Sequence, residues 1–191
     1  NQSEYSLVAP SDHYIKNRDY SRLIPKSFKN LPNHLIYGVK PTEPMTDFGY
    51  IKVREPKKRI SDVLGFFEKP NRSKAIKYFK NNFFWNSGIF FINNKLLIEN
   101  YKNLYPKIYK TCLKIIQNLK NDLEFLQTSE TLLRTLPNIS FDNAILEKVS
   151  DLTMMRLNYV WKDLGSWESL ASYSKINEVA LDDDSFIYNN S

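Results

Sequence analysis

The sequence predicts an α/β fold built on one mixed sheet, and two patterns in its 191 residues support this class. Short apolar, β-branched runs are separated by amphipathic stretches, an order typical of strands that pair in parallel through helical crossovers. Two β-rich runs on either side of a basic, proline-containing loop predict a hairpin, which adds antiparallel pairing. With 42% apolar and 14% aromatic residues, the chain is long enough for one sizeable core. We therefore expect one globular unit over residues 1–175 and a linker over residues 176–191.

The first half of the chain is predicted to form mainly strands. The runs "YSLVAP" and "HLIYGVKP" each end at a proline, and "FGYIKV" and "ISDVLGFFEKP" form the hairpin around "REPKKR". The stretch "RSKAIKYFKNN" has apolar residues at helical spacing and offers Asn71 or Ser73 as its N-cap. The most apolar run, "FFWNSGIFFIN", predicts a central strand that the polar step at residues 86–88 interrupts.

The second half is predicted to be mainly helical. From Lys95 to Leu136 the apolar positions recur with helical spacing opposite a row of lysines, and Pro137 ends this block. The run "SFDNAILEKVS" predicts a short helix that begins at Ser140 or Asp142. It is followed by "LTMMRLNYVW", which predicts one strand leading into Asp163.

Composition argues against several classes of protein. The excess of 27 Lys and Arg over 21 Asp and Glu is small and spread along the chain, and no nucleic-acid-binding motif accompanies it. The longest apolar runs fall well short of the roughly 18 residues that cross a bilayer. The N-terminal residues lack the basic and apolar regions of a signal peptide, and the single cysteine, Cys112, has the position of a core residue in an amphipathic helix. We therefore expect a cytoplasmic protein with neither a nucleic-acid nor a membrane partner.

Three carboxylates come just after predicted strands: Asp12, Glu68 and Asp163. Ligands of α/β sheets gather at the carboxyl ends of strands, so these positions are candidate functional ones. Asp12 and Asp163 together would suit Mg²⁺, which usually takes one or two carboxylates and completes its coordination with water and phosphate oxygens. The alternative is that both are caps or turn residues, as Asp often is. His13 and His34 show no metal-ligand spacing, and we assign them no chemical role.

The neighbouring polar residues would suit a phosphorylated, hydroxylated ligand. Lys69 offers a point charge for a phosphate, and Glu68 accepts hydrogen bonds from hydroxyls, although an exposed Glu–Lys ion pair is the alternative. Asn86 offers both a donor and an acceptor to a polyol, and Gly88 lets a ligand approach the backbone. A plain β-bulge explains Asn86 and Gly88 equally well.

Six ordered motifs together resemble the sugar nucleotidyltransferases, and most closely the mannose-1-phosphate guanylyltransferases of that family. They run from Leu7 to Leu170 and read "LVAPSDHYI", "YGVKPTEPMTDFGYIKV", "GFFEKPN", "FFWNSGIFFI", "SFDNAILEKVSD" and "VWKDLGSWESL". The resemblance implies a Rossmann-like nucleotidyltransferase domain and a reaction that joins mannose 1-phosphate to GTP and releases pyrophosphate. Such transfers are catalysed mainly by positioning and charge neutralisation, so a metal, a lysine and groups that bind hydroxyls suffice.

Matched motif by motif, the resemblance also implies residue roles. Asp12 of "PSDH" and Asp163 of "WKDLGSW" would hold Mg²⁺, and these two residues with Lys69 would form the catalytic set. Mannose 1-phosphate and GTP would be the small-molecule partners. The implied substrate-binding residues are Glu68 and Asn86 for the mannose hydroxyls, Lys69 for the sugar phosphate, and Gly49 for close approach to the sugar.

The chain departs from the family pattern in two respects. Where the family usually has "PETGYGYI" this chain has "PMTDFGYI", so Met45 replaces an acid and Asp47 replaces a glycine. A positive φ at Asp47 would strain the backbone, and its charge would repel a phosphate. The five glycines are isolated, and the glycine-rich signature that wraps a nucleoside triphosphate does not occur in these residues. Residues 1–175 are therefore expected to be the later, C-terminal part of the nucleotidyltransferase domain.

Several alternatives stay open at this point. The chain is either part of a GDP-mannose-forming enzyme, part of a transferase for another hexose 1-phosphate, or a noncatalytic remnant that acts as a regulatory partner. A nucleic-acid-binding module, supported only by the pI of about 9.2, is the weakest alternative. We expect the isolated chain not to make GDP-mannose at an appreciable rate, and we expect it to associate with a second copy or with a segment that carries the glycine-rich half.

Overall fold

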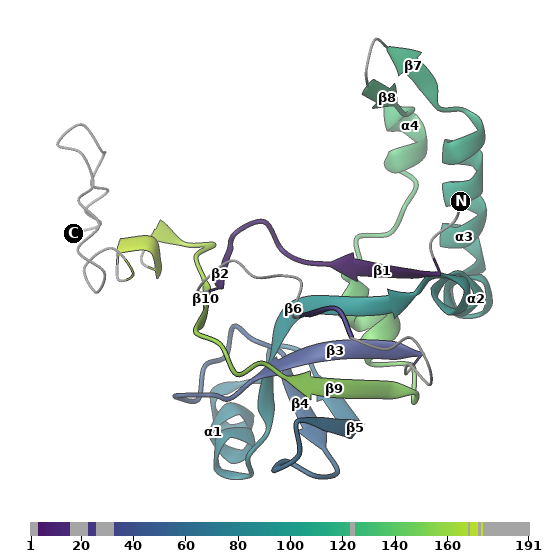
Figure 1. The fold of residues 1–191 in the computed structure, drawn as a ribbon. Helices are drawn as coiled ribbons and strands as arrows, with labels where there is room; N and C mark the ends of the chain where they lie inside the picture. The colour runs from purple at the N-terminus through teal and green to yellow at the C-terminus, as the bar shows by residue number, and fades with distance from the viewer. Residues whose placement is uncertain are drawn as a thin grey trace, which may run out of the picture.

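The structure, a computed structural model, describes residues 4–15, 23–25, 33–122, 125–167, 169–171 and 173. Its centre is a six-stranded sheet in the order β1–β6–β3–β9–β5–β4 (Figure 1). The β3–β9 pair is parallel and the other pairs are antiparallel, which confirms the predicted mixed α/β class. The strands are β1 (Tyr5–Val8), β3 (His34–Val39), β4 (Tyr50–Val53), β5 (Ile60–Phe67), β6 (Phe84–Asn93) and β9 (Leu152–Arg156).

Strand β6 makes the sheet close on itself. One edge of β6 pairs with β3, while its other edge pairs with β1 near its C-terminal end and with β4 near its N-terminal end. Because β4 also pairs with β5 and β5 with β9, the strands β6, β3, β9, β5 and β4 form a ring. The polar step at residues 86–88 does not end the strand. It is an irregularity within β6, where Gly88 has a φ of +69° and the register against β3 shifts.

Two clusters of buried side chains form the core. Successive residues of β3, β6 and β9 contribute alternately to one cluster or the other, as expected for the two faces of a sheet. Helix α1 (Arg72–Lys80) packs Ala75 against the first cluster. The single π-helical turn η2 (Asp142–Leu146) packs Leu146 against the second. The candidate functional residues therefore lie on or next to elements whose apolar side chains form these two buried clusters.

The predicted helix α1 is confirmed, and the longer predicted helical block is only partly right. Asn71 is the N-cap of α1, since its Oδ1 accepts a hydrogen bond from the backbone N–H of Lys74 at 3.0 Å. Helices α2 (Asn94–Leu104) and α3 (Pro106–Gln117) match the prediction, but α3 stops where the Asn118 side chain donates to the carbonyl of Lys114. The hairpin of β7 (Lys120–Asp122) and β8 (Phe125–Gln127) then precedes the short helix α4 (Glu130–Leu133).

Two further expectations need correction. The run "LTMMRLNYVW" forms two strands: β9 ends at Arg156, and β10 (Trp161–Asp163) pairs with β2 (His13–Ile15) in a separate two-stranded sheet. Arg156 Nε donates to Asn158 Oδ1, and the chain bends at Tyr159 between the two strands. Cys112, expected in the core, is only half-buried on α3.

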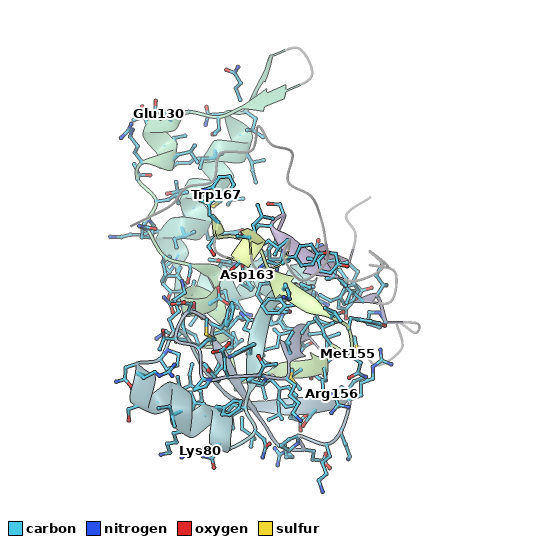
Figure 2. The ribbon with its side chains drawn as sticks, turned by 90° about the vertical axis from the view of Figure 1, so that its left-hand side faces the viewer. Lys80, Glu130, Met155, Arg156, Asp163 and Trp167 are labelled. Atoms are coloured by element: carbon cyan, nitrogen blue, oxygen red, sulfur yellow. The ribbon has the colours of Figure 1, made fainter. Side chains whose placement is uncertain are left out.

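The elements occupy distinct parts of the molecule. Helices α2, α3 and α4 stand at one end, while α1 and the β4–β5 hairpin lie at the other (Figure 1). Figure 2 shows Glu130 and Lys80 near these opposite ends, with Asp163 between them. No helix within the described ranges is long and apolar enough to span a membrane. The predicted linker at residues 176–191 lies outside the described residues.

Candidate functional site

Asp12 and Asp163 lie side by side although they come from opposite ends of the chain. Strands β2 and β10 pair antiparallel, which places Asp163 opposite His13. The backbone N–H of Leu164 donates to the carbonyl of Asp12 at 2.9 Å. The two segments are thus held together by backbone hydrogen bonds on both sides of the acidic pair.

Both carboxylates approach one histidine nitrogen. Asp12 Oδ1 and Asp163 Oδ2 are each 3.8 Å from His13 Nε2, so these two oxygens lie within twice that distance of each other. The expected proximity of Asp12 and Asp163 is therefore observed. If both carboxylates ligated one Mg²⁺ at metal–oxygen distances of about 2.1 Å, their ligating oxygens would lie within about 4.2 Å of each other, so their metal role stays a prediction.

Gly165 keeps the space between the two carboxylates free of carbon. A Cβ at this position would lie 2.7 Å from Asp12 Oδ2 and 3.0 Å from Asp163 Oδ1, closer than packed atoms allow. The Gly165 N–H also donates to Asp163 Oδ1 at 2.8 Å. A glycine two residues after Asp163 thus lets the backbone both orient that carboxylate and leave room in front of it.

This arrangement suits a hard divalent cation that takes few protein ligands. Two carboxylates from separate segments, one of them oriented by the Gly165 N–H, suit Mg²⁺, since water and phosphate oxygens complete its coordination. In the part of the chain that the structure describes, no group of three or more His, Cys, Asp or Glu side chains is placed to hold a metal. The two-carboxylate donor set is compatible with Mg²⁺, and its binding stays a prediction.

A second cluster joins Gly49, Glu68 and Asn86, which the sequence motifs assign to sugar binding. The Asn86 N–H donates to the carbonyl of Gly49 at 2.8 Å. A Cβ on Gly49 would lie 2.6 Å from Glu68 Oε2 and 3.4 Å from Asn86 Cβ. Glycine at position 49 therefore leaves room for the Glu68 carboxylate at the start of β4, whereas the Asn86 side chain would be at ordinary contact distance from a Cβ there.

Two further carboxylates in this cluster are not predicted from the sequence. Asn86 Nδ2 donates to Asp142 Oδ1 at 2.8 Å, and the Glu68 N–H donates to Glu147 Oε1 at 3.3 Å. Asp142 belongs to η2 and Glu147 follows it directly, so one turn presents both carboxylates. The run "SFDNAILEKVS" indicates only a helix start, although its two acids five positions apart are the available signal.

Burial and mutual repulsion perturb these carboxyl groups. Burial raises the pKa of Glu68 above its ordinary value, and the nearby Asp142 raises it further, while Lys69 opposes both. Burial likewise raises the pKa of Asp142, whereas its hydrogen bonds and Lys69 oppose the rise. Lys69 is therefore the cation that offsets a cluster of three carboxylates, the third being Glu147.

Lys69 also has an unusual backbone. Its φ is +38°, in the left-handed region that residues with a Cβ rarely adopt, and the buried Pro70 follows it. Strained backbones of this kind cluster at functional sites. Apart from Lys69, Asn82 is the other non-glycine residue with positive φ within the described ranges, so the strain considered for Asp47 is absent. Asp47 is instead an exposed residue of the loop before β4.

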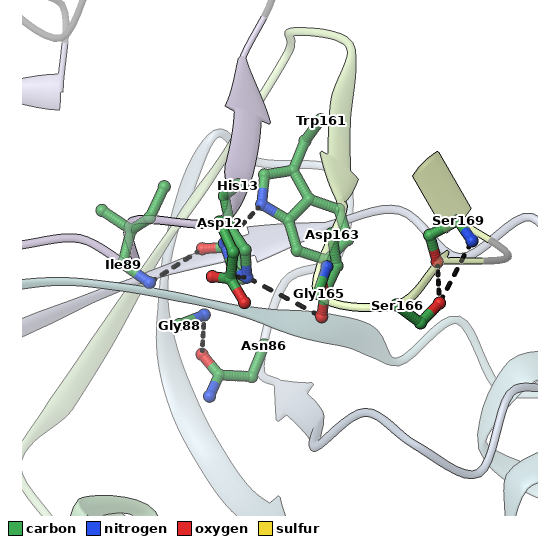
Figure 3. A network of polar contacts seen from close by, with 11 residues as sticks. Asp12, His13, Asn86, Gly88, Ile89, Trp161, Asp163, Gly165, Ser166 and Ser169 are labelled. Atoms are coloured by element: carbon green, nitrogen blue, oxygen red, sulfur yellow. Dashed lines mark hydrogen bonds and ion pairs between the residues drawn. The ribbon is translucent and has the colours of Figure 1, made fainter. Parts of the chain in front are cut away.

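The two clusters meet at the Asn86–Gly88 step of β6. The Gly88 N–H donates to Asn86 Oδ1 at 3.2 Å. A Cβ on Gly88 would lie 3.4 Å from the His13 ring and 3.0 Å from Pro10. Figure 3 shows Asp12, His13 and Asp163 gathered next to this step. That both clusters line one concave surface stays a prediction. A cavity of about 750 Å³ lies elsewhere, lined by residues that include Lys40, Phe79 and Arg156.

Comparison with known proteins supports the motif assignment. The chain matches the nucleotidyl transferase family over residues 1–178. It is 30% identical over 184 residues to a mannose-1-phosphate guanylyltransferase of Escherichia coli, covering 92% of this chain and 40% of that protein. It is 31% identical over 173 residues to the xanthan biosynthesis protein XanB of Xanthomonas campestris, covering 88% of this chain and 37% of XanB. The chain thus spans about two fifths of the length of these curated relatives.

Solved structures share the fold. A Helicobacter pylori protein described as a mannose-6-phosphate isomerase superposes with a TM-score of 0.74 at 31% identity, covering 85% of this chain and 66% of that one. A Thermus thermophilus protein described as a mannose-1-phosphate geranyltransferase superposes with a TM-score of 0.72 at 24% identity, covering 88% of this chain and 49% of that one. Because the family match extends over nearly the whole chain and the fold agrees with it, the chain belongs to the nucleotidyl transferase family.

Proposed function

We propose that the chain forms the sugar-phosphate-binding and Mg²⁺-binding part of a mannose-1-phosphate guanylyltransferase, which joins mannose 1-phosphate to GTP and releases pyrophosphate. The observation that carries this proposal is that Gly88, whose N–H donates to Asn86 Oδ1, lies against the ring of His13, and both Asp12 and Asp163 approach that ring. A phosphorylated sugar placed there would extend its hydroxyls to one cluster and its phosphate toward the other. The names of the curated relatives favour mannose 1-phosphate as that sugar.

Each residue of the site has a role in this proposal. Asp12 and Asp163 would hold Mg²⁺, which when bound neutralises the negative charge of the phosphates. Lys69, an exposed cation at the end of β5, would bind the phosphate of the sugar. Glu68 would accept hydrogen bonds from sugar hydroxyls, and Gly49 would let the sugar approach the backbone.

Asn86 is preorganised for its part of this role. Its Oδ1 accepts from the Gly88 N–H and one Nδ2 hydrogen is donated to Asp142, so the orientation of the amide is fixed. The second Nδ2 hydrogen is left to donate to a sugar hydroxyl. A fixed donor of this kind reduces the entropy lost on binding and positions the sugar for transfer.

Thermal unfolding with sugar phosphates tests the substrate class. In the presence of Mg²⁺, mannose 1-phosphate should raise the melting temperature more than glucose 1-phosphate does, because ligand at a hundredfold excess over its Kd stabilises the folded state by about 2.7 kcal/mol. Lys69→Gln should remove most of this shift, whereas Lys74→Gln on the exposed face of α1 should not. A larger shift with glucose 1-phosphate would favour the rival hexose, and no shift with either sugar would overturn the proposal.

A second candidate, a noncatalytic binding partner, is favoured by the loop before β4. Met45 stands where the family has an acid, and its side chain packs against the core while its carbonyl accepts from the Tyr50 hydroxyl at 2.8 Å. This position therefore supports the fold. Both candidates predict that the purified chain releases pyrophosphate from GTP and mannose 1-phosphate at far less than the roughly 1 to 1,000 turnovers per second common among enzymes, so turnover within that range would reject the noncatalytic candidate.

A further inference from the structure

His13, to which the sequence pattern assigns no role, is closely packed beside Asp12 and Asp163. Its side chain is only 10% exposed. The Trp161 ring stands perpendicular to the His13 ring, with centroids 5.2 Å apart, and Trp161 Nε1 lies 3.3 Å from His13 Nδ1. Gly88 of β6 lies against the ring, since a Cβ at this position would be 3.4 Å from His13 Cε1.

The contact with Trp161 fixes which ring nitrogen of His13 carries a proton. An indole N–H donates hydrogen bonds and never accepts them, so His13 Nδ1 must be the acceptor. In the neutral ring the proton therefore sits on Nε2. This nitrogen is 3.8 Å from both Asp12 Oδ1 and Asp163 Oδ2, which is beyond hydrogen-bond distance, so its N–H acts on the two carboxylates by electrostatic attraction.

We propose that His13 is a positioning residue for the metal site, an inference that rests on the proposed function. Oriented by Trp161, its Nε2–H offsets the repulsion between Asp12 and Asp163 and holds both carboxylates where one cation can bridge them. The same proton leaves Nε2 without a lone pair, so His13 is not itself a metal ligand. Residues that orient metal ligands typically contribute about 10-fold to 100-fold to metal affinity.

The protonation state of the ring is the first test, and it needs no metal. Long-range ¹H–¹⁵N NMR spectra of the full chain at a pH where His13 is neutral should show the proton on Nε2. Trp161→Phe removes the donor while retaining an aromatic ring, and should give a mixture of the two tautomers. A proton on Nδ1 in the unsubstituted protein would overturn the inference whether or not the proposed function is right.

Metal affinity is the second test, with Mn²⁺ as a paramagnetic probe for the Mg²⁺ site. His13→Leu should weaken Mn²⁺ binding about 10-fold to 100-fold, while His13→Gln, whose amide can still donate, should recover most of the affinity. His34→Gln, at a buried histidine that contacts Asn100 on α2, serves as the control and should leave the affinity unchanged. Thermal unfolding of each variant confirms that it is folded.

The outcomes separate the two proposals. Equal loss in His13→Leu and His13→Gln would show that His13 does not act as a donor, and would overturn the positioning role. Undetectable Mn²⁺ binding by the unsubstituted chain, with the Nε2 tautomer present, would count against the proposed function and leave the His13–Trp161 arrangement standing. Unchanged affinity in every His13 variant would likewise reject the positioning role.

Discussion

Lys69 is the cation that offsets the carboxylates of Glu68 and Asp142, and it has a backbone conformation that few lysines adopt. Its φ of +38° is followed by a proline, whose ring restricts the residue before it further. A left-handed conformation costs about 1 to 2 kcal/mol for a residue with a Cβ. The fold tolerates this cost at a position where its side chain is exposed and lies near Glu68 and Asp142.

Substitutions at Lys69 distinguish the cost of its left-handed backbone from the contribution of its ammonium group to ligand binding. Lys69→Gly should raise the free energy of unfolding by about 1 kcal/mol, because glycine adopts the same φ without strain. Lys69→Ala should leave the stability nearly unchanged. Both variants lose the ammonium group and should bind mannose 1-phosphate more weakly, by about 10-fold or more, on the order of a charge-assisted hydrogen bond. Urea unfolding and calorimetric titration give the two quantities, and a Lys69→Gly variant less stable than Lys69→Ala would contradict the account of the backbone.

The raised pKa of Glu68 predicts a pH-dependent stability. A carboxyl whose pKa is higher in the folded chain than in the unfolded chain contributes stability that is complete below its ordinary pKa, here 4.5, and is lost as pH rises through the folded pKa. The free energy of unfolding of Glu68→Gln should therefore fall less between about pH 4 and about pH 7 than that of the unsubstituted protein. Glu99→Gln, at an exposed position on α2, is the control. Parallel pH curves for Glu68→Gln and the unsubstituted protein would refute the assignment.

At the scale of elements, the local sequence pattern predicts the β-strands and α1. The predictions that are wrong concern segments whose structure depends on tertiary contacts. The apolar runs ended by Pro10 and Pro41 form β1 and β3: Tyr5 and Leu7 of β1 pack against the first core, and alternate residues of β3 fill both cores. The predicted helical block is too long, since its lysine-rich pattern continues past Asn118 while the capping amide ends the helix there. The split between β9 and β10 depends on pairing with β2, a partner from the opposite end of the described chain that no local window contains.

The N-cap of α1 gives a prediction at this scale. Asn71→Ala removes the acceptor of the Lys74 N–H at the helix that follows Lys69 and Pro70. The substitution should lower the free energy of unfolding by about 1 kcal/mol, while Asn71→Asp, which keeps an acceptor oxygen, should cost much less. Chemical denaturation followed by circular dichroism measures both. Equal losses in the two variants would mean that the cap hydrogen bond does not stabilise α1.

At the scale of the whole molecule, the site forms because the fold brings the two ends of the described chain together. The motifs identify Asp12 and Asp163, but their proximity depends on the β2–β10 pairing, and the contacts of His13, Asp142 and Glu147 appear only in three dimensions. The roles of His13, Asp142 and Glu147 cannot be recognised from their spacing in the sequence, because their partners come from other elements. The central claim is therefore that two distant carboxylates act as one cation site.

A double-mutant cycle on Mn²⁺ affinity tests this claim most directly. The unsubstituted chain, Asp12→Asn, Asp163→Asn and the double variant are titrated with Mn²⁺ and the free ion is measured by electron paramagnetic resonance, with exposed Asp62→Asn as the control. If one cation bridges the pair, each single substitution should lose nearly as much affinity as the double, because removing either ligand dismantles the same site. Losses that simply add, or single variants that bind as tightly as the unsubstituted chain, would contradict the account.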